Sequence, residues 1–316
     1  MNNLLQRLAS EFILPMHDLR YLIRSAPYRY KVYEIPKREP GKTRTIAQPA
    51  RELKPLQRWI MENVLSKYPI HPSATAYRKG MNIANNAWPH AHHRYLLKMD
   101  FKDFFPSIKS SDFEKFVLAN PLDASWSEEE IGHLSRMLFW KKKRTEDLRL
   151  SIGAPSSPLL SNILLYRFDV MVNELCSSRG VSYTRYADDL TFSTSKRDLL
   201  YQIEREIPPI CTRLQSPRLR INRDKTIHVS KKSSRRVTGL ILTNDGNVSI
   251  GRDRKRQVRA AFHKFVLGML DAKEATKLAG MIAYIKSVEP AYLEKLREKY
   301  GAAILNDLFL LNSGHD

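Results

Sequence analysis

Tyr183-Thr-Arg-Tyr-Ala-Asp-Asp-Leu-Thr-Phe-Ser-Thr194 is the stretch on which the fold of this chain depends, because it places two adjacent acids between residues that favour strands. Acids are disfavoured inside a strand, so the pattern predicts a strand pair over Ser182 to Thr194 around a turn. Neighbouring strand residues point to opposite faces, and Asp188 and Asp189 therefore converge on one site only if a tight turn redirects one of them. We expect a hairpin with both carboxylates at its tip.

A second acid ends the apolar run Tyr95-Leu-Leu-Lys-Met-Asp100, which is typical of a buried strand and is followed by Phe101-Lys-Asp-Phe-Phe-Pro106. Phosphoryl transfer requires metal ions, about 3.5 to 4 Å apart, that align the attacking oxygen and neutralise the leaving one. Mg²⁺ prefers carboxylate oxygens. Taken alone, an Asp-Asp pair is more often a solvated turn, and Asp100 a helix cap. Together, at the ends of strands of one sheet, these acids indicate a metal-dependent site.

The segments around these acids predict an antiparallel sheet covered by helices. Ser157 is expected to cap a helix with Pro158 at its first position, and apolar residues then recur at helical spacing as far as Leu175. A further strand is expected over Thr226 to Ser230. The order of strand, helix, hairpin, helix and strand resembles the split β-α-β arrangement of an α+β fold, with helices on one side of an antiparallel sheet. From Arg252 onward, apolar stripes of period near 3.6 predict a helical end.

The composition favours a polyanionic partner. The 316 residues include 53 Lys and Arg against 33 Asp and Glu, a formal charge of +20, and nucleic acid is the first candidate. One predicted helix carries a basic stripe, formed by Arg252, Arg256, Arg259 and His263 at spacings of four, three and four. A second cluster consists of Lys231, Lys232, Arg235 and Arg236. Charge runs are often only solvated surface, but the overall basicity favours contacts with phosphates.

Membrane proteins and disulfide-rich secreted proteins are not favoured. No run approaches the roughly 18 apolar residues of a membrane span, and the start of the chain carries Arg7 and Glu11 in place of a signal-peptide apolar block. Cys176 and Cys211 match neither a disulfide framework nor a zinc site. We expect a cytoplasmic protein with reduced cysteines.

Three motifs resemble, in their usual order, the central motifs of reverse transcriptases. They are the strand ending in Asp100 with Phe104-Phe105-Pro106, then Gly153-Ala-Pro-Ser-Ser-Pro158 with Asn162, and then Tyr186-Ala-Asp-Asp-Leu190. Two further motifs resemble the retron branch of that family: Asn86-Ala-Trp-Pro-His90 fits Asn-Ala-x-x-His, and Val237-Thr-Gly239 fits Val-Thr-Gly. The resemblance spans most of the chain.

The resemblance implies a right-hand polymerase fold. Residues 1–95 would form the fingers and an N-terminal helical region. Residues 96–245 would form the palm, with some finger elements, around an antiparallel sheet with helices on one face. Residues 246–316 would form a short helical thumb.

The same resemblance implies roles for the residues around the acids. Asp100, Asp188 and Asp189 would be the catalytic carboxylates that bind two Mg²⁺ ions, with the Phe101 carbonyl as a further metal ligand. Lys225 matches the palm lysine that protonates the leaving pyrophosphate, although a surface lysine before a strand is nearly as frequent.

A set of nucleotide-binding residues also follows from the resemblance: Lys42, Arg44, Phe105, Gly153, Ala154 and Pro155. The ring of Phe105 matches the aromatic gate that excludes a ribose 2′-hydroxyl. Arg44 suits bidentate contact with the triphosphate of the incoming deoxynucleotide. Many relatives have Gln just before the Gly of the middle motif, where this chain has Ile152, a departure expected to alter nucleotide affinity or fidelity.

The retron resemblance implies a dedicated structured non-coding RNA that is both template and primer. Synthesis would start from a 2′-hydroxyl of that RNA and give a branched RNA–DNA molecule, with Asn86, His90 and the basic stripe at the nucleic acid. An effector protein for anti-phage defence and a host RNase H are the other implied partners. The alternatives are a group II intron-like or diversity-generating reverse transcriptase, and an RNA-binding scaffold that is catalytically silent. The motifs at 86–90 and 237–239 disfavour the first, and the intact acids disfavour the second.

Overall fold

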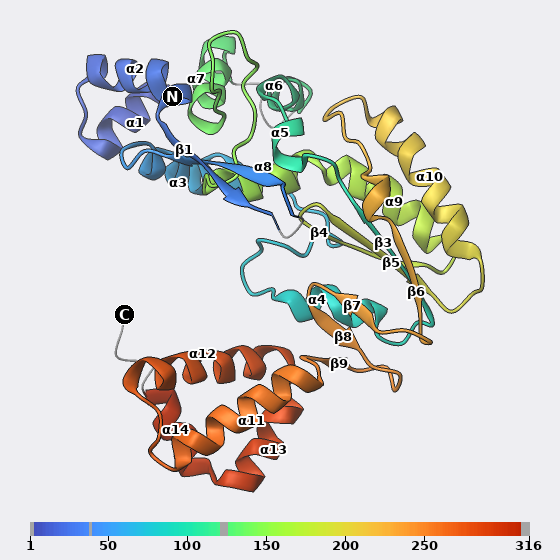
Figure 1. Cartoon of the computed structure of the whole chain (residues 1–316). Coiled ribbons are helices and arrows are strands. Elements are labelled where there is room, and N and C mark those ends of the chain that lie inside the picture. Colours follow the sequence, from blue (N-terminus) through green and yellow to red (C-terminus); the bar gives the residue numbers. More distant parts are fainter. Residues whose placement is uncertain (1–2, 38–39, 121–125, 311–316) are drawn as a thin grey trace.

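The computed structural model describes residues 3–37, 40–120 and 126–310, and its helices and antiparallel sheets confirm the α+β class (Figure 1). The central sheet has the order β4-β5-β3-β6, and all neighbouring strands are antiparallel. Its strands are β3 (Tyr95–Asp100), β4 (Ser182–Tyr186), β5 (Asp189–Thr194) and β6 (Ile227–Ser230). The predicted hairpin and the strand before Asp100 are therefore confirmed, and the fourth strand begins one residue later than expected.

The alternating side chains of β3 contact two different hydrophobic clusters. Leu97 and Met99 are buried in the larger cluster, whereas Leu96, the residue before Leu97, points to the other face and is buried in the second. On the side of the larger cluster lie α9 (Tyr166–Ser177) and α10 (Leu199–Leu214). The central sheet is consequently covered on both faces along part of its length.

The larger cluster joins the central sheet to the N-terminal half of the chain. Its helices include α1 (Leu4–Phe12), α2 (Met16–Ser25), α3 (Leu53–Asn63), α5 (Phe104–Ser107), α6 (Ser110–Leu118), α7 (Glu128–Leu138) and α8 (Ser156–Leu164). Beside them lies a hairpin of β1 (Tyr30–Pro36) and β2 (Thr43–Pro49). Ser127 caps α7 through the N–H of Glu130, and Glu130 in turn accepts a bond from the N–H of Leu4 at 2.9 Å.

The helix after the middle motif differs from its prediction in two respects. It begins at Ser156, so Ser157 lies inside α8 and does not cap it; its hydroxyl is buried and has no hydrogen-bond partner among the described residues. The helical run is also divided at Leu165, where α8 ends and α9 begins. Apolar periodicity continues through this break, and the sequence pattern therefore did not reveal it.

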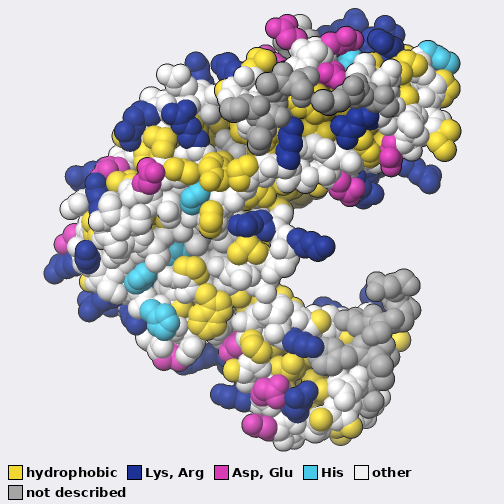
Figure 2. Space-filling view, turned by 180° about the vertical axis from the view of Figure 1, so that it is seen from behind, with side chains coloured by type: hydrophobic (Ala, Val, Ile, Leu, Met, Phe, Trp, Pro, Cys, Tyr) yellow, Lys and Arg dark blue, Asp and Glu magenta, His cyan; other side chains and the backbone are white. Residues whose placement is uncertain are grey.

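The second cluster joins the C-terminal helices to a small sheet and to a helix from the first hundred residues. Its elements are α4 (Ile83–Ala87), β7 (Arg235–Val237), β8 (Leu240–Leu242), β9 (Val248–Ser249), α11 (Arg252–Val266), α12 (Ala272–Val288), α13 (Pro290–Tyr300) and α14 (Ala302–Leu310). The predicted helical end is thus confirmed. A deep hollow separates these helices from the rest of the molecule, and Lys and Arg side chains project into it (Figure 2). In the described ranges, no helix has the length and apolar character needed to span a membrane.

Candidate active site

The three predicted acids lie at one end of the central sheet. Asp100, the last residue of β3, is paired with Asp189, the first residue of β5. Asp188 stands in the two-residue turn between β4 and β5, and its carbonyl accepts a bond from the N–H of Phe101 at 3.1 Å. The other turn residue, Ala187, has a φ of 57°, in the left-handed region that disfavours residues with a Cβ. The chain thus forms the predicted tight turn with an unfavourable backbone conformation.

The carboxylates at this end of the sheet oppose each other's ionisation. Burial, with the nearby negative charges of Asp100 and Asp189, raises the pKa of Asp188 to about 6. Burial also raises the pKa of Asp189, where repulsion from Asp100 is partly offset by Lys98 and Lys225. This arrangement of acids therefore favours a bound cation.

Lys225 supplies one positive charge to this site. It ends the short 3₁₀ turn η5 (Arg223–Lys225), and its Nζ lies 3.3 and 3.4 Å from the two carboxylate oxygens of Asp100. Just before that turn, the N–H of Asn222 donates to the carbonyl of Asp100 at 2.7 Å, which joins the two segments. The Lys225 side chain is about half exposed, so its ammonium is free to move away from Asp100.

The donor set suits a hard divalent cation, because it consists of carboxylate and carbonyl oxygens. Within the described ranges, no three His, Cys, Asp or Glu side chains already form a group that would hold a metal ion. Binding by Asp100, Asp188 and Asp189 therefore requires their carboxylates to turn towards one another. Lys225 Nζ, 3.3 Å from Asp100 Oδ1, would compete with such a cation for this carboxylate.

A cavity of about 380 Å³ contains most of the residues predicted to bind the nucleotide. Its lining comprises Gln48, Lys54, Arg58, Tyr77, Phe105, Ser151, Ile152, Gly153, Ala154, Pro155, Ser157 and Pro158. Phe105 is half-buried there, while its neighbour Phe104 is buried and stacks on Phe101 with ring centres 5.6 Å apart. The two aromatics of this motif therefore have different surroundings, as expected if only Phe105 faces a substrate.

Gly153 lies against the β1–β2 hairpin. Its φ is 127°, and a Cβ added to it would lie 3.1 Å from the carbonyl oxygen of Ala47. The N–H of Ala47 donates to the carbonyl of Ile152 at 2.9 Å. The middle motif is therefore joined to β2, and only glycine permits so close an approach with this backbone conformation.

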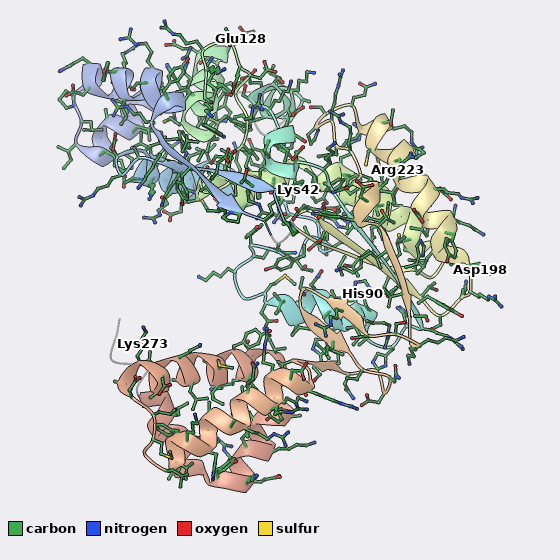
Figure 3. The ribbon with its side chains drawn as sticks, in the orientation of Figure 1. Lys42, His90, Glu128, Asp198, Arg223 and Lys273 are labelled. Carbon is green, nitrogen blue, oxygen red and sulfur yellow. The ribbon has the colours of Figure 1, made fainter. Side chains whose placement is uncertain are left out.

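Two basic residues reach this region from the β1–β2 hairpin. Lys42 lies at the tip of the β1–β2 hairpin, and Arg44 follows it on β2 (Figure 3). Burial raises the pKa of Tyr77; the negative charge of Asp188 raises it further, and the positive charge of Arg44 lowers it. Tyr77 therefore lines the cavity within reach of the charges of Asp188 and Arg44.

Tyr77, Lys54 and Arg58 were not identified from the sequence. Lys54 and Arg58 lie four residues apart on α3, a spacing that places them on one helix face but resembles that of any exposed basic pair. Tyr77 has a φ of 60°, and its ring centre lies 6.3 Å from that of Tyr186. Neither this backbone conformation nor this ring contact can be predicted from the residues that surround Tyr77 in the sequence.

Asn86 and His90 are buried, which corrects the expectation that their side chains contact RNA. Both side chains are 0% exposed. The ring nitrogens of His90 are hydrogen-bonded to Ser193 Oγ at 2.7 Å and Thr184 Oγ1 at 2.8 Å. Asn86 accepts a bond from the hydroxyl of Thr75 at 2.9 Å. This motif connects β4 and β5 to α4 and the 3₁₀ turn Trp88–His90, and its role in this structure is internal.

The predicted basic stripe lies on the surface of α11. Arg252, Arg256, Arg259 and His263 are all exposed, whereas Val258 and Phe262 of the same helix are buried. In the second predicted cluster, Arg235 is only 1% exposed and donates to the carbonyls of His93 and Thr243. Arg235 is therefore a structural residue and does not belong to a surface that follows phosphates.

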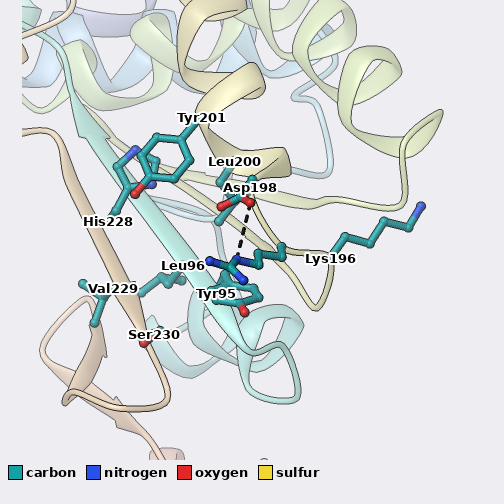
Figure 4. A pocket seen from close by; sticks show the side chains of 10 residues that line it. Tyr95, Leu96, Lys196, Asp198, Leu200, Tyr201, His228, Val229 and Ser230 are labelled. Carbon is teal, nitrogen blue, oxygen red and sulfur yellow. Dashed lines mark ion pairs between the residues drawn. The ribbon is translucent and has the colours of Figure 1, made fainter.

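A different cavity, of about 250 Å³, lies at the opposite end of β3 and β6 (Figure 4). Its lining includes Tyr201, whose ring stacks on His228 with centres 4.2 Å apart. The charges of Arg197 and Asp198 are paired there, at 3.4 Å. None of the acids of the site lines this cavity.

Comparison with known proteins identifies the family. Residues 35–242 match the family model of reverse transcriptase (RNA-dependent DNA polymerase). The chain is 39% identical over 300 residues to the retron Ec83 reverse transcriptase of Escherichia coli, covering 94% of this chain and 95% of that protein. The chain belongs to the retron reverse transcriptases. The retron Ec86 reverse transcriptase of Escherichia coli is 34% identical over 321 residues, covering 97% of this chain and 93% of the relative. The activity of this reverse transcriptase is RNA-directed DNA polymerisation, a nucleotidyl transfer.

A solved structure supports the fold assignment. The apo telomerase of Candida tropicalis superimposes with a TM-score of 0.54 at 12% sequence identity. The match covers 88% of this chain and 58% of the telomerase chain. At this identity the likeness concerns the fold alone, and it confirms a right-hand polymerase.

The buried His90 predicts a pH dependence of stability for this reverse transcriptase. Burial lowers the pKa of His90 to about 3, so between the ordinary pKa of about 6.5 and that value the unfolded chain binds a proton that the folded chain does not. The free energy of unfolding should therefore fall as the pH is lowered, by on the order of 2 kcal/mol between pH 7 and pH 5 from this residue. Urea unfolding of wild type and His90→Gln at both pH values measures it. The variant should be less stable at pH 7 but lose less on acidification; equal losses would exclude this role for His90.

Proposed function

We propose that this chain copies a dedicated structured non-coding RNA into DNA, starting from a 2′-hydroxyl of that RNA, and so makes a branched RNA-linked single-stranded DNA (msDNA). The observation that carries the proposal is the end of the central sheet, where Asp100 and Asp189 are paired and Asp188 occupies the turn beside them. A template-copying site needs such acids next to a nucleotide cavity, and the charge of Asp188 acts on Tyr77, which lines that cavity.

In this proposal Asp100, Asp188, Asp189 and the Phe101 carbonyl hold two Mg²⁺ ions. When bound, the ions align the attacking hydroxyl and neutralise charge on the leaving pyrophosphate. The remaining steps are carried out by side chains of the protein. Lys225, which contacts Asp100 in this structure, moves to the pyrophosphate and donates a proton to it. Its half-exposed side chain permits that movement.

The incoming deoxynucleotide is placed in the cavity beside Phe105. Arg44 and Lys42 bind its triphosphate, because a planar guanidinium matches phosphate oxygens in pairs and an ammonium adds a compact charge. The backbone from Gly153 to Pro155 lies along the nucleotide, and the Phe105 ring fills the space that a ribose 2′-hydroxyl would need.

The nucleic acid occupies the hollow between the C-terminal helices and the rest of the molecule (Figure 2). Here residues 1–95 act as fingers, 96–245 as palm and 246–316 as thumb. The exposed stripe Arg252, Arg256, Arg259 and His263 of α11 neutralises phosphates, which gives salt-sensitive affinity without sequence choice. Selection of the cognate RNA then depends on its fold and on its unpaired bases.

The cellular setting rests on the family alone. We infer that the enzyme works in the cytoplasm, that an effector protein couples its product to anti-phage defence, and that a host RNase H removes the copied template. A group II intron-like enzyme would have the same acids but a different RNA, and a silent scaffold would bind RNA without synthesis. The next experiment distinguishes all three.

The proposal predicts a DNA that remains attached to RNA. The chain is expressed together with its adjacent genomic non-coding region, and the extracted nucleic acid should contain a short DNA that is released only after debranching. Asp188→Asn combined with Asp189→Asn should abolish this DNA while RNA binding persists, because the acids serve chemistry and not phosphate contacts. Asp198→Asn, the same substitution at the far end of the sheet, is the matched control and should leave the DNA level unchanged.

The other outcomes separate the alternatives. If the enzyme extends an ordinary primer on RNA but makes no branched DNA, the polymerase activity is supported and RNA-linked priming is rejected. RNA binding with neither product would favour the scaffold. Synthesis by the double variant would show that the acids are not catalytic.

Phe105 predicts the sugar preference of the enzyme. Phe105→Ala should raise ribonucleotide incorporation relative to deoxynucleotide incorporation by about ten- to a hundredfold, since the space beside the sugar is opened. Single-nucleotide extension with matched dNTP and rNTP measures the ratio. Phe105→Tyr keeps the ring and should keep the discrimination. An unchanged preference in Phe105→Ala would remove the gate role.

A further inference from the structure

A fully buried ion pair lies directly behind the acid-bearing turn. Arg185 of β4 and Asp169 of α9 are both 0% exposed. Arg185 Nε donates to Asp169 Oδ1 at 2.8 Å, and Nη2 donates to Oδ2 at 2.6 Å, a fork that engages both carboxylate oxygens. The Tyr183 hydroxyl donates to the same carboxylate at 2.7 Å. The guanidinium therefore has one fixed orientation.

The remaining nitrogen of this guanidinium reaches the turn itself. Arg185 Nη1 donates to the carbonyl of Ala187 at 3.1 Å and to Oδ1 of Asn162, on α8, also at 3.1 Å. Ala187 is the turn residue in the left-handed conformation. A hydrogen bond from a rigid, charged donor stabilises that conformation, which an alanine disfavours when unconstrained. The orientation of Arg185 consequently influences where the next two residues, Asp188 and Asp189, are placed.

The same group of residues also fixes one wall of the nucleotide cavity. Asn162 Nδ2 donates to the carbonyl of Ala76 at 2.9 Å, and the N–H of Thr75 donates to the carbonyl of Arg185 at 2.9 Å. These bonds hold the segment that leads into Tyr77, which lines the cavity. The contacts to the wall thus run through the Asn162 amide and the Arg185 backbone, whereas the Arg185 side chain itself contacts the turn.

We propose that Arg185 is a positioning residue for polymerisation, which orients the acid-bearing turn through the Ala187 carbonyl while Asp169 and Asn162 hold its guanidinium. Arg185 contacts no substrate, and its effect is exerted on the placement of Asp188 and Asp189. Misplacement of a catalytic group by about 1 Å is enough to lower a rate by about 100-fold. This inference rests on the proposed role of the acids.

The first test is Arg185→Lys. A lysine keeps one nitrogen, Nζ, for the Asp169 carboxylate and preserves the buried charge pair, but it has no counterpart of Arg185 Nη1, which contacts Ala187. Extension of a DNA primer on an RNA template should show kcat lower by about 100-fold, with the KM for dNTP and the Kd for RNA changed by less than about threefold. Wild-type extension is measured first, so that failure of the proposed function is recognised separately.

Arg179→Lys is the matched control. Arg179 forms an ion pair with Glu206 at 2.5 Å, partly exposed and without a contact to the turn. It undergoes the same chemical change and should retain wild-type kcat, KM and thermal unfolding temperature. A kcat for Arg185→Lys within about twofold of this control would overturn the proposal.

A second variant removes the ion pair without leaving an unpaired buried charge. Tyr183→Phe, Asp169→Leu and Arg185→Met together replace it with apolar side chains of similar volume, a change that is often neutral for stability. The folded triple variant should still bind RNA with wild-type Kd but show the same loss of kcat. Wild-type kcat in this variant, or failure of both variants to fold, would show that the pair serves stability alone and would reject the positioning role.

Discussion

The pairing of Asp100 with Asp189 across β3 and β5 is the constraint from which the rest of this site follows. Two acids directly opposite each other on antiparallel strands repel, and partial burial makes their joint ionisation harder still. The sheet order places β3 between β5 and β6. The segment just before β6 therefore brings Lys225 to Asp100 as a compensating charge. This cluster of carboxylates is unfavourable without a bound cation, and it suits a reaction that uses metal ions.

The β4–β5 hairpin, which carries the acid-bearing turn, is supported from both faces of the sheet by buried polar groups. On one face, Arg185 is held by Asp169 and donates to the carbonyl of Ala187. On the other face, His90 is hydrogen-bonded to hydroxyls of β4 and β5. Buried polar groups with satisfied partners impose one geometry, because any displacement leaves a donor or acceptor unpaired. The motif at residues 86–90 therefore supports the central sheet in this structure.

The sequence was sufficient to predict the elements that carry the acids, because strand-forming residues flank the acid pair and an apolar run of strand length ends in Asp100. It was not sufficient to separate buried from exposed polar residues. Asn86, His90 and Arg235 resemble nucleic-acid contacts in sequence, and only tertiary packing reveals that they are internal. Tyr77 is held at the site by long-range bonds of the two residues before it, Thr75 and Ala76, to β4 and α8, which no local pattern records.

The most direct test of the central claim is to locate the metal ions. Anomalous diffraction would be measured with Mn²⁺ on crystals of the enzyme bound to an RNA template, a chain-terminated primer and the matching dNTP. The account predicts two peaks among the carboxylates of Asp100, Asp188 and Asp189, with Lys225 Nζ displaced from Asp100 towards the pyrophosphate. Peaks away from these acids, or no peak with the dNTP in place, would contradict it.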